Sequence, residues 1–216
     1  MKGLLLVALL ITARLPANTN ASSQAESFLA TLSASQKAKA VHPYTHEGRT
    51  AFNYVTGTQR GIALSDLTGP QKASAFRLLA ACVSEAGTTK IQDIRALEDE
   101  LHKLENGNPN RDTERYWLMF FGEPSQTKDW VWRYEGHHTS LTFAYRNGKL
   151  VASTPQFLGA NPSSVPLHKE RDLALDFMRS LNENQKSKTI LKQNVPGDIV
   201  TSMDRKAEIK DRTGIE

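Results

Sequence analysis

The feature that most constrains the fold is a block of aromatic and β-branched residues that spans positions 116 to 155. Such residues favour strands over helices. Tyr116–Phe121 is an unbroken apolar run, which predicts a strand buried on both faces. Trp130–Tyr145 follows with alternating character, and Asn147-Gly148 predicts a tight hairpin because both residues tolerate positive φ. The block therefore predicts an antiparallel β-meander from about 116 to 155.

Helical spacing of apolar residues surrounds this block. It is weak in Ser23–Val41 and clear in Pro70–Ala86, where Gly87 supplies a stop. A second helix is expected to run from Ile91 to the terminating segment 106–109. Helical spacing returns in Pro166–Asn184. The order of helices, strands and a C-terminal helix predicts an α+β fold rather than alternating βα units.

The first residues have the pattern of a secretory leader. Lys2 precedes the apolar run Gly3–Ile11, and small residues near Thr19–Ala21 suit a cleavage site. We expect residues 1–21 to be a signal peptide and residues 22–216 to be a single α+β domain, exported to the periplasm or the exterior. The apolar run is about half of the roughly 20 residues that a bilayer span needs, so no stable membrane span is expected after cleavage.

Composition and charge narrow the function classes. The chain has 216 residues, 39% of them hydrophobic, and a formal net charge of +4. Basic and acidic residues alternate instead of forming a basic patch, which argues against nucleic-acid binding. The single cysteine, Cys82, excludes an intramolecular disulfide, so stability must come from the core.

The end of the chain suggests an incomplete domain. The ending Arg212–Glu216 repeats part of Arg60–Leu67, the segment that leads into the helix at Pro70. This echo predicts that the domain continues beyond residue 216 in a longer gene product.

The candidate chemistry centres on Glu135-Gly136-His137-His138. In a regular strand, Arg133, Glu135 and His137 share one face and His138 lies on the other, unless a bulge at Gly136 redirects them. A carboxylate and an imidazole at this spacing suit a divalent metal, and they equally suit a base with its orienting partner. The alternative is a structural Arg133–Glu135 pair with hydrogen-bonded histidines.

Other candidate residues carry less information. His42 and His46 are expected in a loop, and His102 and His168 are expected at the surface. The tryptophans Trp117, Trp130 and Trp132 either line a ligand groove or belong to the core. No nucleophile elbow, phosphate-binding glycine loop or Cys-x-x-Cys pair occurs in the sequence. Serine hydrolase, thiol-redox and nucleotide-cofactor chemistry are therefore not expected.

Three strings resemble one known family. They are Phe121–Pro124, Trp130–His138 and Thr154–Pro162, and Arg60–Ile62 and Gln71 match the upstream pattern of the same family. Together they resemble the family catalogued as domain of unknown function 3500, whose members look like exported bacterial and some fungal proteins.

The resemblance implies a longer domain and concentrates polar identity at a few positions. These are Arg133, Glu135, His137, His138 and Asn161. The chain departs from the family at Val131, where glycine is frequent, and at Thr142, where asparagine is frequent. These departures put the activity of this copy in doubt.

The leading hypothesis is a metal-dependent enzyme, with hydrolysis as the expected reaction. Glu135, His137 and His138 would bind zinc, copper, manganese or iron, Arg133 would hold an anionic part of the substrate, and Asn161 would orient substrate or water. The expected partner is a small-molecule or peptide ligand. The alternatives are a non-catalytic exported binding protein with structural histidines, and a truncated remnant without function.

Overall fold

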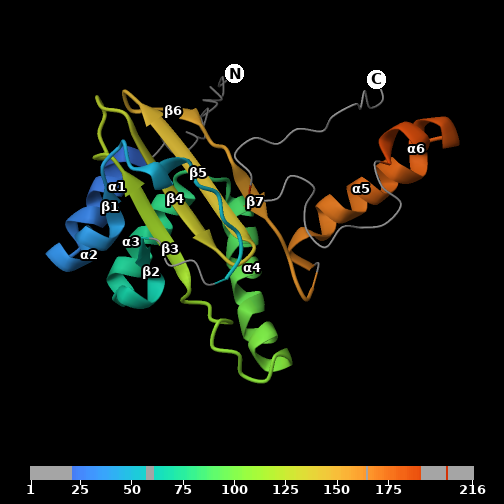
Figure 1. The fold of residues 1–216 in the computed structure, drawn as a ribbon, viewed down its shortest axis with the longest axis horizontal. Helices are drawn as coiled ribbons and strands as arrows, with labels where there is room; N and C mark the ends of the chain where they lie inside the picture. The colour runs from blue at the N-terminus through green and yellow to red at the C-terminus, as the bar shows by residue number, and fades with distance from the viewer. Residues whose placement is uncertain (1–20, 57–60, 164, 191–202, 204–216) are drawn as a thin grey trace, which may run out of the picture.

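The computed structural model describes residues 21–56, 61–163, 165–190 and 203, and its centre is a mixed sheet (Figure 1). The sheet has seven strands in the order β1-β3-β4-β5-β6, with β2 also paired to β3 and β7 to β5. The strands are β1 Val41–His42, β2 Ile62–Ala63, β3 Tyr116–Phe121, β4 Trp130–Gly136, β5 Thr139–Arg146, β6 Lys149–Ala152 and β7 Gln156–Leu158.

Six α-helices and three short 3₁₀ helices accompany the sheet within the described residues. They are α1 Ala21–Ala30, α2 Ala34–Ala40, α3 Gly69–Ala80, α4 Glu85–Leu104, α5 His168–Ser180 and α6 Glu183–Thr189, with η1 Glu47–Thr50, η2 Leu64–Asp66 and η3 Val165–Leu167. The predicted α+β class is confirmed, with helices before the meander and a helix after it.

The central pairs β3–β4, β4–β5 and β5–β6 are antiparallel, as the meander prediction requires. Asn147 and Gly148 both have positive φ, 50° and 71°, between β5 and β6. This confirms the predicted tight turn, because these two residues accept that conformation with little strain. The parallel pairing of β1 with β3 was not predicted.

The helix boundaries differ from the predicted ones for local reasons. The expected helix Ser23–Val41 is divided, because Ser33 caps α2 by accepting a hydrogen bond from the Gln36 backbone N–H while the Gln36 side chain bonds the Ser33 N–H. Ser84 is likewise the N-cap of α4, where its side chain accepts a hydrogen bond from the Gly87 N–H at 3.1 Å. Residues between α3 and α4 therefore form a turn, and α4 begins before Ile91.

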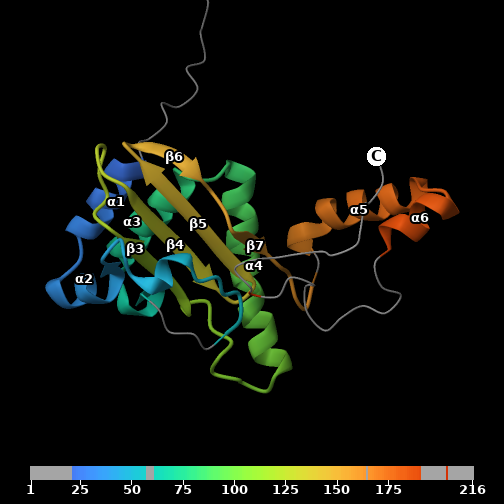
Figure 2. The ribbon, with the colours of Figure 1, turned by 45° about the horizontal axis from the view of Figure 1, so that its top comes forward.

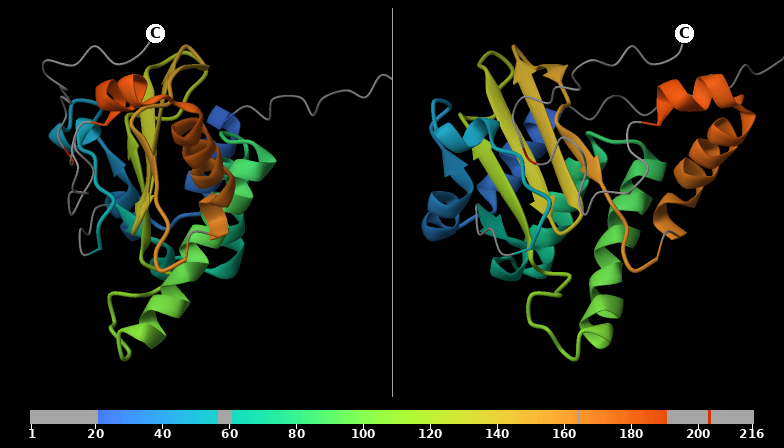
Figure 3. Two further views of the ribbon diagram at one scale, coloured as in Figure 1. Left: turned by 90° about the vertical axis from the view of Figure 1, so that its right-hand side faces the viewer. Right: turned by 45° about the vertical axis from the view of Figure 1, so that its right-hand side comes forward.

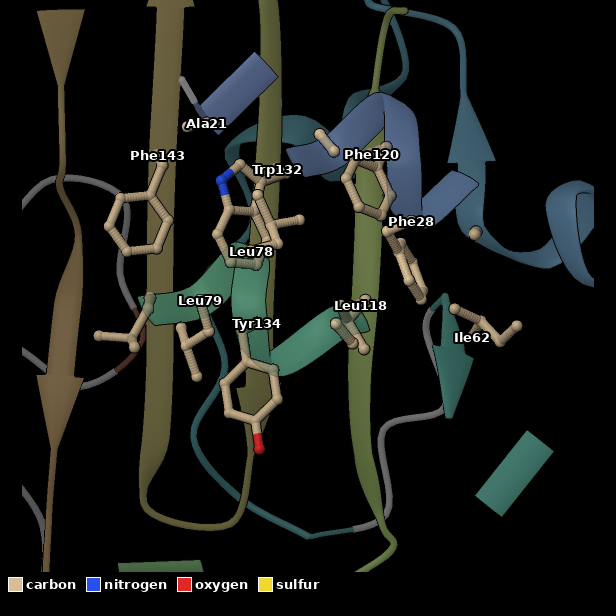
Figure 4. Close-up of a cluster of buried hydrophobic side chains, with 14 of the residues drawn as sticks. Ala21, Phe28, Ile62, Leu78, Leu79, Leu118, Phe120, Trp132, Tyr134 and Phe143 are labelled. Atoms are coloured by element: carbon tan, nitrogen blue, oxygen red, sulfur yellow. The ribbon is translucent and has the colours of Figure 1, made fainter. Parts of the chain in front are cut away.

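The two faces of the sheet are covered by different material (Figure 3). Helices α1, α3 and α4 cover one face, where Trp132, Tyr134 and Phe143 meet Leu78 and Leu79 of α3 (Figure 4). The chain between β1 and residue 56, which includes η1, lies against the other face. Below, these are called the helix face and the loop face.

Helices α5 and α6 extend away from the sheet (Figures 1 and 2). An ion pair between Lys90 of α4 and Glu170 ties α5 to the body. Leu173 and Phe177 of α5 are 69% and 51% exposed. No helix in the described ranges combines the length and the apolar character that a bilayer span requires.

The cysteine lies just after α3, half-buried beside the helix-face core. Its Sγ is 3.3 Å from the Tyr145 hydroxyl, and burial raises the pKa of the Cys82 thiol to about 11. A thiol that stays protonated at neutral pH is a poor nucleophile. Cys82 therefore acts as a packing residue.

Candidate functional site

The two adjacent histidines form the tip of a hairpin. Strand β4 ends at Gly136 and β5 begins at Thr139, with those two residues paired, so His137 and His138 are the two-residue connection. His137 therefore does not continue the strand on the Arg133 face, and the redirection at Gly136 that the sequence left open is the end of the strand and not a bulge. His138 occupies positive φ, 56°, which is uncommon for residues other than glycine.

Long-range contacts hold this turn in place. The His138 N–H donates to the carbonyl of Tyr54 at 2.8 Å, and the Gly159 N–H donates to the carbonyl of His138 at 2.8 Å. The Tyr116 hydroxyl donates to the carbonyl of His137 at 2.9 Å. A Cβ at Gly136 would lie 2.3 Å from the Tyr116 ring, so only glycine permits this approach. The turn is fixed by neighbours on three other segments.

A buried carboxylate of α4 contacts the first histidine. The Oε1 atom of Glu98 is hydrogen-bonded to Nδ1 of His137. The Glu98 side chain is 2% exposed and that of His137 is 11% exposed. Buried carboxylates are rare unless they have a partner, and a bond to the imidazole fixes both the ring and its tautomer.

An arginine completes this group. Nη1 of Arg111 lies 3.3 Å from both ring nitrogens of His137. Arg111 in turn is held by Glu105, with Nη2 and Oε1 2.8 Å apart. The Glu105 carboxylate raises the pKa of the Arg111 guanidinium, which keeps it charged. The network places a fixed cation beside His137.

The second histidine is kept neutral. Its ring stacks on that of His137 with 3.9 Å between the centroids. Burial, and then the nearby His137 and Arg111, lower the pKa of His138 to about 4. At neutral pH, His138 is therefore an uncharged ring that supports His137.

The other two predicted site residues on β4 lie on the loop face, away from Glu98. Nη1 of Arg133 is 3.7 Å from Oε2 of Glu135, and both side chains are 1% exposed. Arg133 also donates to the carbonyls of Gly48 and Arg49 at 3.2 and 2.9 Å, and to the Thr142 hydroxyl at 3.2 Å. This is the structural pair that the sequence left open. Arg133 is too enclosed to hold a substrate in this conformation.

The structure does not gather the three predicted metal ligands. In the part of the chain that is described, no group of three or more His, Cys, Asp or Glu side chains is arranged to hold a metal. The reason is the hairpin: Glu135 stays on the loop face, while His137 turns toward Glu98. The rings of His137 and His138 are stacked, so their in-plane lone pairs do not converge. Divalent metal binding stays a prediction.

Asn161 lies near this turn but outside the network. It is exposed and follows β7 by a few residues, close in sequence to Gly159, whose N–H reaches His138. Its predicted role in orienting substrate is neither supported nor opposed by a contact among the described residues.

The tryptophans and the other histidines that the sequence offered as candidates lie outside this network. Trp130 and Trp132 are fully buried in the helix-face core, which is one of the two alternatives that the sequence left open. The His102 and His168 rings are exposed and bonded to nearby carbonyls. His42 and His46 lie together, with ring centroids 4.8 Å apart.

Sequence reasoning missed Glu98 and Arg111. A signal for Glu98 was present, since Ile91, Ile94, Glu98 and Leu101 are the buried residues of α4 and recur at helical spacing. A carboxylate inside an apolar stripe predicts a buried partner. Arg111 follows the end of α4 in an irregular segment, and nothing in its local sequence links it to His137.

The family suggested by the sequence motifs is confirmed by comparison with known families. Residues 17–216 match the family described as Protein of unknown function (DUF3500). No curated protein and no solved structure matches the chain. Since the match covers nearly the whole length, the chain belongs to the DUF3500 family.

Proposed function

We propose that this chain is an exported hydrolase whose general base is His137, oriented by Glu98. One observation carries the proposal: a buried carboxylate on a helix bonds directly to an imidazole at the tip of a hairpin. A base that is fixed by an acidic partner is the recurring arrangement of acid–base catalysis. The predicted role of Glu135 in the chemistry passes to Glu98.

The chemistry follows from the tautomer that Glu98 selects. When Nδ1–H donates to the carboxylate, Nε2 of His137 carries the free lone pair. This nitrogen removes a proton from water as the water oxygen bonds to an ester or amide carbonyl carbon. The resulting imidazolium is stabilised by Glu98, and its proton passes to the leaving group when the bond to that group breaks.

Arg111 supplies the charge that this reaction needs. In the structure, Nη1 of Arg111 lies 3.3 Å from Nε2 of His137. A substrate oxygen held beside Nε2 would therefore also lie close to the guanidinium. A substrate oxygen that becomes negative would accept a hydrogen bond from the guanidinium. This favours substrates with a carboxylate or another anionic group near the scissile bond. Asn161 remains the proposed group for orienting substrate.

The test is a hydrolysis assay on the purified full chain with 4-nitrophenyl acetate and 4-nitrophenyl succinate. We expect saturable hydrolysis, faster for the anionic succinate, and a loss of about 100-fold or more in kcat/KM for His137→Gln. His102→Gln is the matched control, because it makes the same substitution at an exposed histidine of α4, the helix that carries Glu98. Equal rates for all three proteins would reject the proposal in favour of a non-catalytic binding protein.

A second candidate retains the metal. The Oε2 atom of Glu98 is buried and has no hydrogen-bond partner among the described residues. A carboxylate and an imidazole are zinc ligands, so an ion could bind between Glu98 and His137. Elemental analysis after dialysis against zinc, copper, manganese and iron tests this. Stoichiometric metal that is lost in the His137→Ala, His138→Ala double variant would support it, and none in the parent would reject it.

Export is part of the proposal and has its own test. It rests on the leader pattern of residues 1–21. Expression with a C-terminal tag, cell fractionation and intact mass should find a chain that has lost the leader outside the cytoplasm. Full-length protein retained in the cytoplasm would contradict export without affecting the proposed chemistry.

A further inference from the structure

The loop face carries a cavity that the Glu98–His137 site does not use. It has a volume of about 510 Å³ and is lined by side chains of β1, β3 and the η1 segment, among them His42, His46, Met119 and Phe121. This volume is within the range of small-molecule sites. Phe121 pairs with Val131, whereas the hairpin tip follows Gly136, so the two sites are roughly 16 Å apart along β4.

Three rings form an aromatic wall in this cavity. The centroid of His42 is 4.8 Å from that of His46 and 5.6 Å from that of Phe121. His46 and Phe121 are 6.0 Å apart. Burial, and then the neighbouring His46, lower the pKa of His42, which favours its uncharged form. Such a wall suits a flat aromatic ligand, which can stack against rings at these separations.

His46 also offers one defined hydrogen-bond donor. Its Nδ1 accepts a hydrogen bond from the Gly48 N–H at 3.0 Å. A nitrogen that accepts carries no hydrogen, so the ring proton is on Nε2. This argues against His46 as a metal ligand through Nε2 and makes Nε2–H a donor for an oxygen. The nearby Glu47 carboxylate, which lines the same cavity, can accept from a hydroxyl.

The cavity walls are held rigidly. Arg133 is fully buried and donates to the carbonyls of Gly48 and Arg49, which fixes η1 over the sheet. Gly61, which also lines the cavity, has φ +80°, and a Cβ there would lie 2.3 Å from the Leu118 carbonyl oxygen, so this position requires glycine. Burying the Arg133 guanidinium costs desolvation free energy. Because the guanidinium fixes the carbonyls of Gly48 and Arg49, we take this cost to indicate that the position of the η1 wall is important for the cavity.

We infer that this cavity is a binding site for planar phenolic compounds. The aromatic ring stacks against His42 and Phe121, and the phenol oxygen, lying in the plane of the His46 ring, accepts from Nε2–H of His46 while its hydrogen is donated to Glu47. Arg133 is a positioning residue for this site. The inference does not depend on the hydrolase proposal.

The test measures the binding of 2-naphthol and of its saturated analogue decahydro-2-naphthol to the full chain by ligand-observed NMR titration. We expect saturable binding of 2-naphthol that is about fivefold tighter than that of the saturated analogue. His46→Phe keeps the ring and removes the donor, and it should weaken 2-naphthol binding about fivefold. Ala51→Phe, which fills the cavity, should abolish binding.

Two controls separate this site from the rest of the molecule. Ala152→Phe adds the same volume on the exposed strand β6, and Glu98→Gln alters the other site; both should bind 2-naphthol as the parent does. The inference is overturned if 2-naphthol shows no saturable binding, if the saturated analogue binds equally well, or if Ala51→Phe retains binding. Loss of binding in Glu98→Gln would also overturn it.

Discussion

The two faces of β4 are equally buried but are stabilised in different ways. Trp132 and Tyr134 point to the helix face and pack against apolar side chains, whereas Arg133 and Glu135 point to the loop face and need polar partners. Apolar packing tolerates many arrangements that fill the same volume. A buried charge needs its partners at defined positions. The helix face of β4 is therefore held by apolar packing, whereas Arg133 and Glu135 on the loop face are held by polar contacts at defined positions.

The largest stability effect is expected on the helix face. Trp132→Ala should lower the free energy of unfolding by about 4 kcal/mol, because the fully buried indole leaves a cavity between the sheet and α3. Urea unfolding at pH 7 measures the change. Val151→Ala on the exposed strand β6 is the control and should change stability by less than about 0.5 kcal/mol. A loss below about 1 kcal/mol for Trp132→Ala would contradict this packing.

The next effect tests the polar pair on the loop face. Arg133→Met should lower the free energy of unfolding by about 3 kcal/mol, because the Glu135 carboxylate loses its ion pair inside the protein. The Arg133→Met, Glu135→Leu double variant should be more stable than Arg133→Met alone. The same urea titration checks both. Additive losses in the double variant would show that the two side chains are not coupled.

A smaller, pH-dependent effect is expected at the hairpin tip. The pKa of His138 is lowered from 6.5 to about 4 in the folded chain. The folded state therefore binds fewer protons than the unfolded state in this range, so the stability from the neutral ring is full above pH 6.5 and is lost as pH falls toward 4.

The variant His138→Asn isolates this contribution, since asparagine tolerates positive φ and does not titrate. Between pH 7 and 4.5 the parent should lose about 1 kcal/mol more than the variant, a figure reduced for solvent screening of the partly exposed ring. Urea unfolding at the two pH values gives both losses. Identical losses would mean that His138 is not held neutral.

The smallest effect is expected at the edge of the sheet. Leu150→Ser on β6 should change the free energy of unfolding by less than about 0.5 kcal/mol, because Leu150 is 49% exposed. Thermal unfolding is sufficient to check this. A loss of 2 kcal/mol or more would indicate that β6 is covered in solution.

Much of the fold was predictable because its signals are local. The apolar run of β3, the Asn147-Gly148 turn and the helical spacing of α3 and α4 each depend on neighbouring residues. Boundaries were less accurate where side-chain caps decided them, as at Ser33 and Ser84. The family was also recognisable from its motifs, and the comparison confirmed it.

The site was only partly predictable because distant segments build it. His137 and His138 are not among the residues that most strongly predict a turn, and their hairpin is fixed by Tyr54, Tyr116 and Gly159. The alternation of side chains in a regular strand would place His137 on the face of Arg133, whereas in the structure His137 turns toward Glu98. The correct acidic partner, Glu98, comes from a helix that packs on the sheet only in the folded chain.

The most direct test of the central claim is a double-mutant cycle on Glu98 and His137, read out as kcat/KM for 4-nitrophenyl succinate. If Glu98 acts by orienting His137, then Glu98→Gln should lower kcat/KM by at least about tenfold, and adding Glu98→Gln to His137→Gln should change nothing further. Unfolding curves would confirm that each variant is folded. Effects that multiply, or a Glu98→Gln variant as active as the parent, would contradict the account.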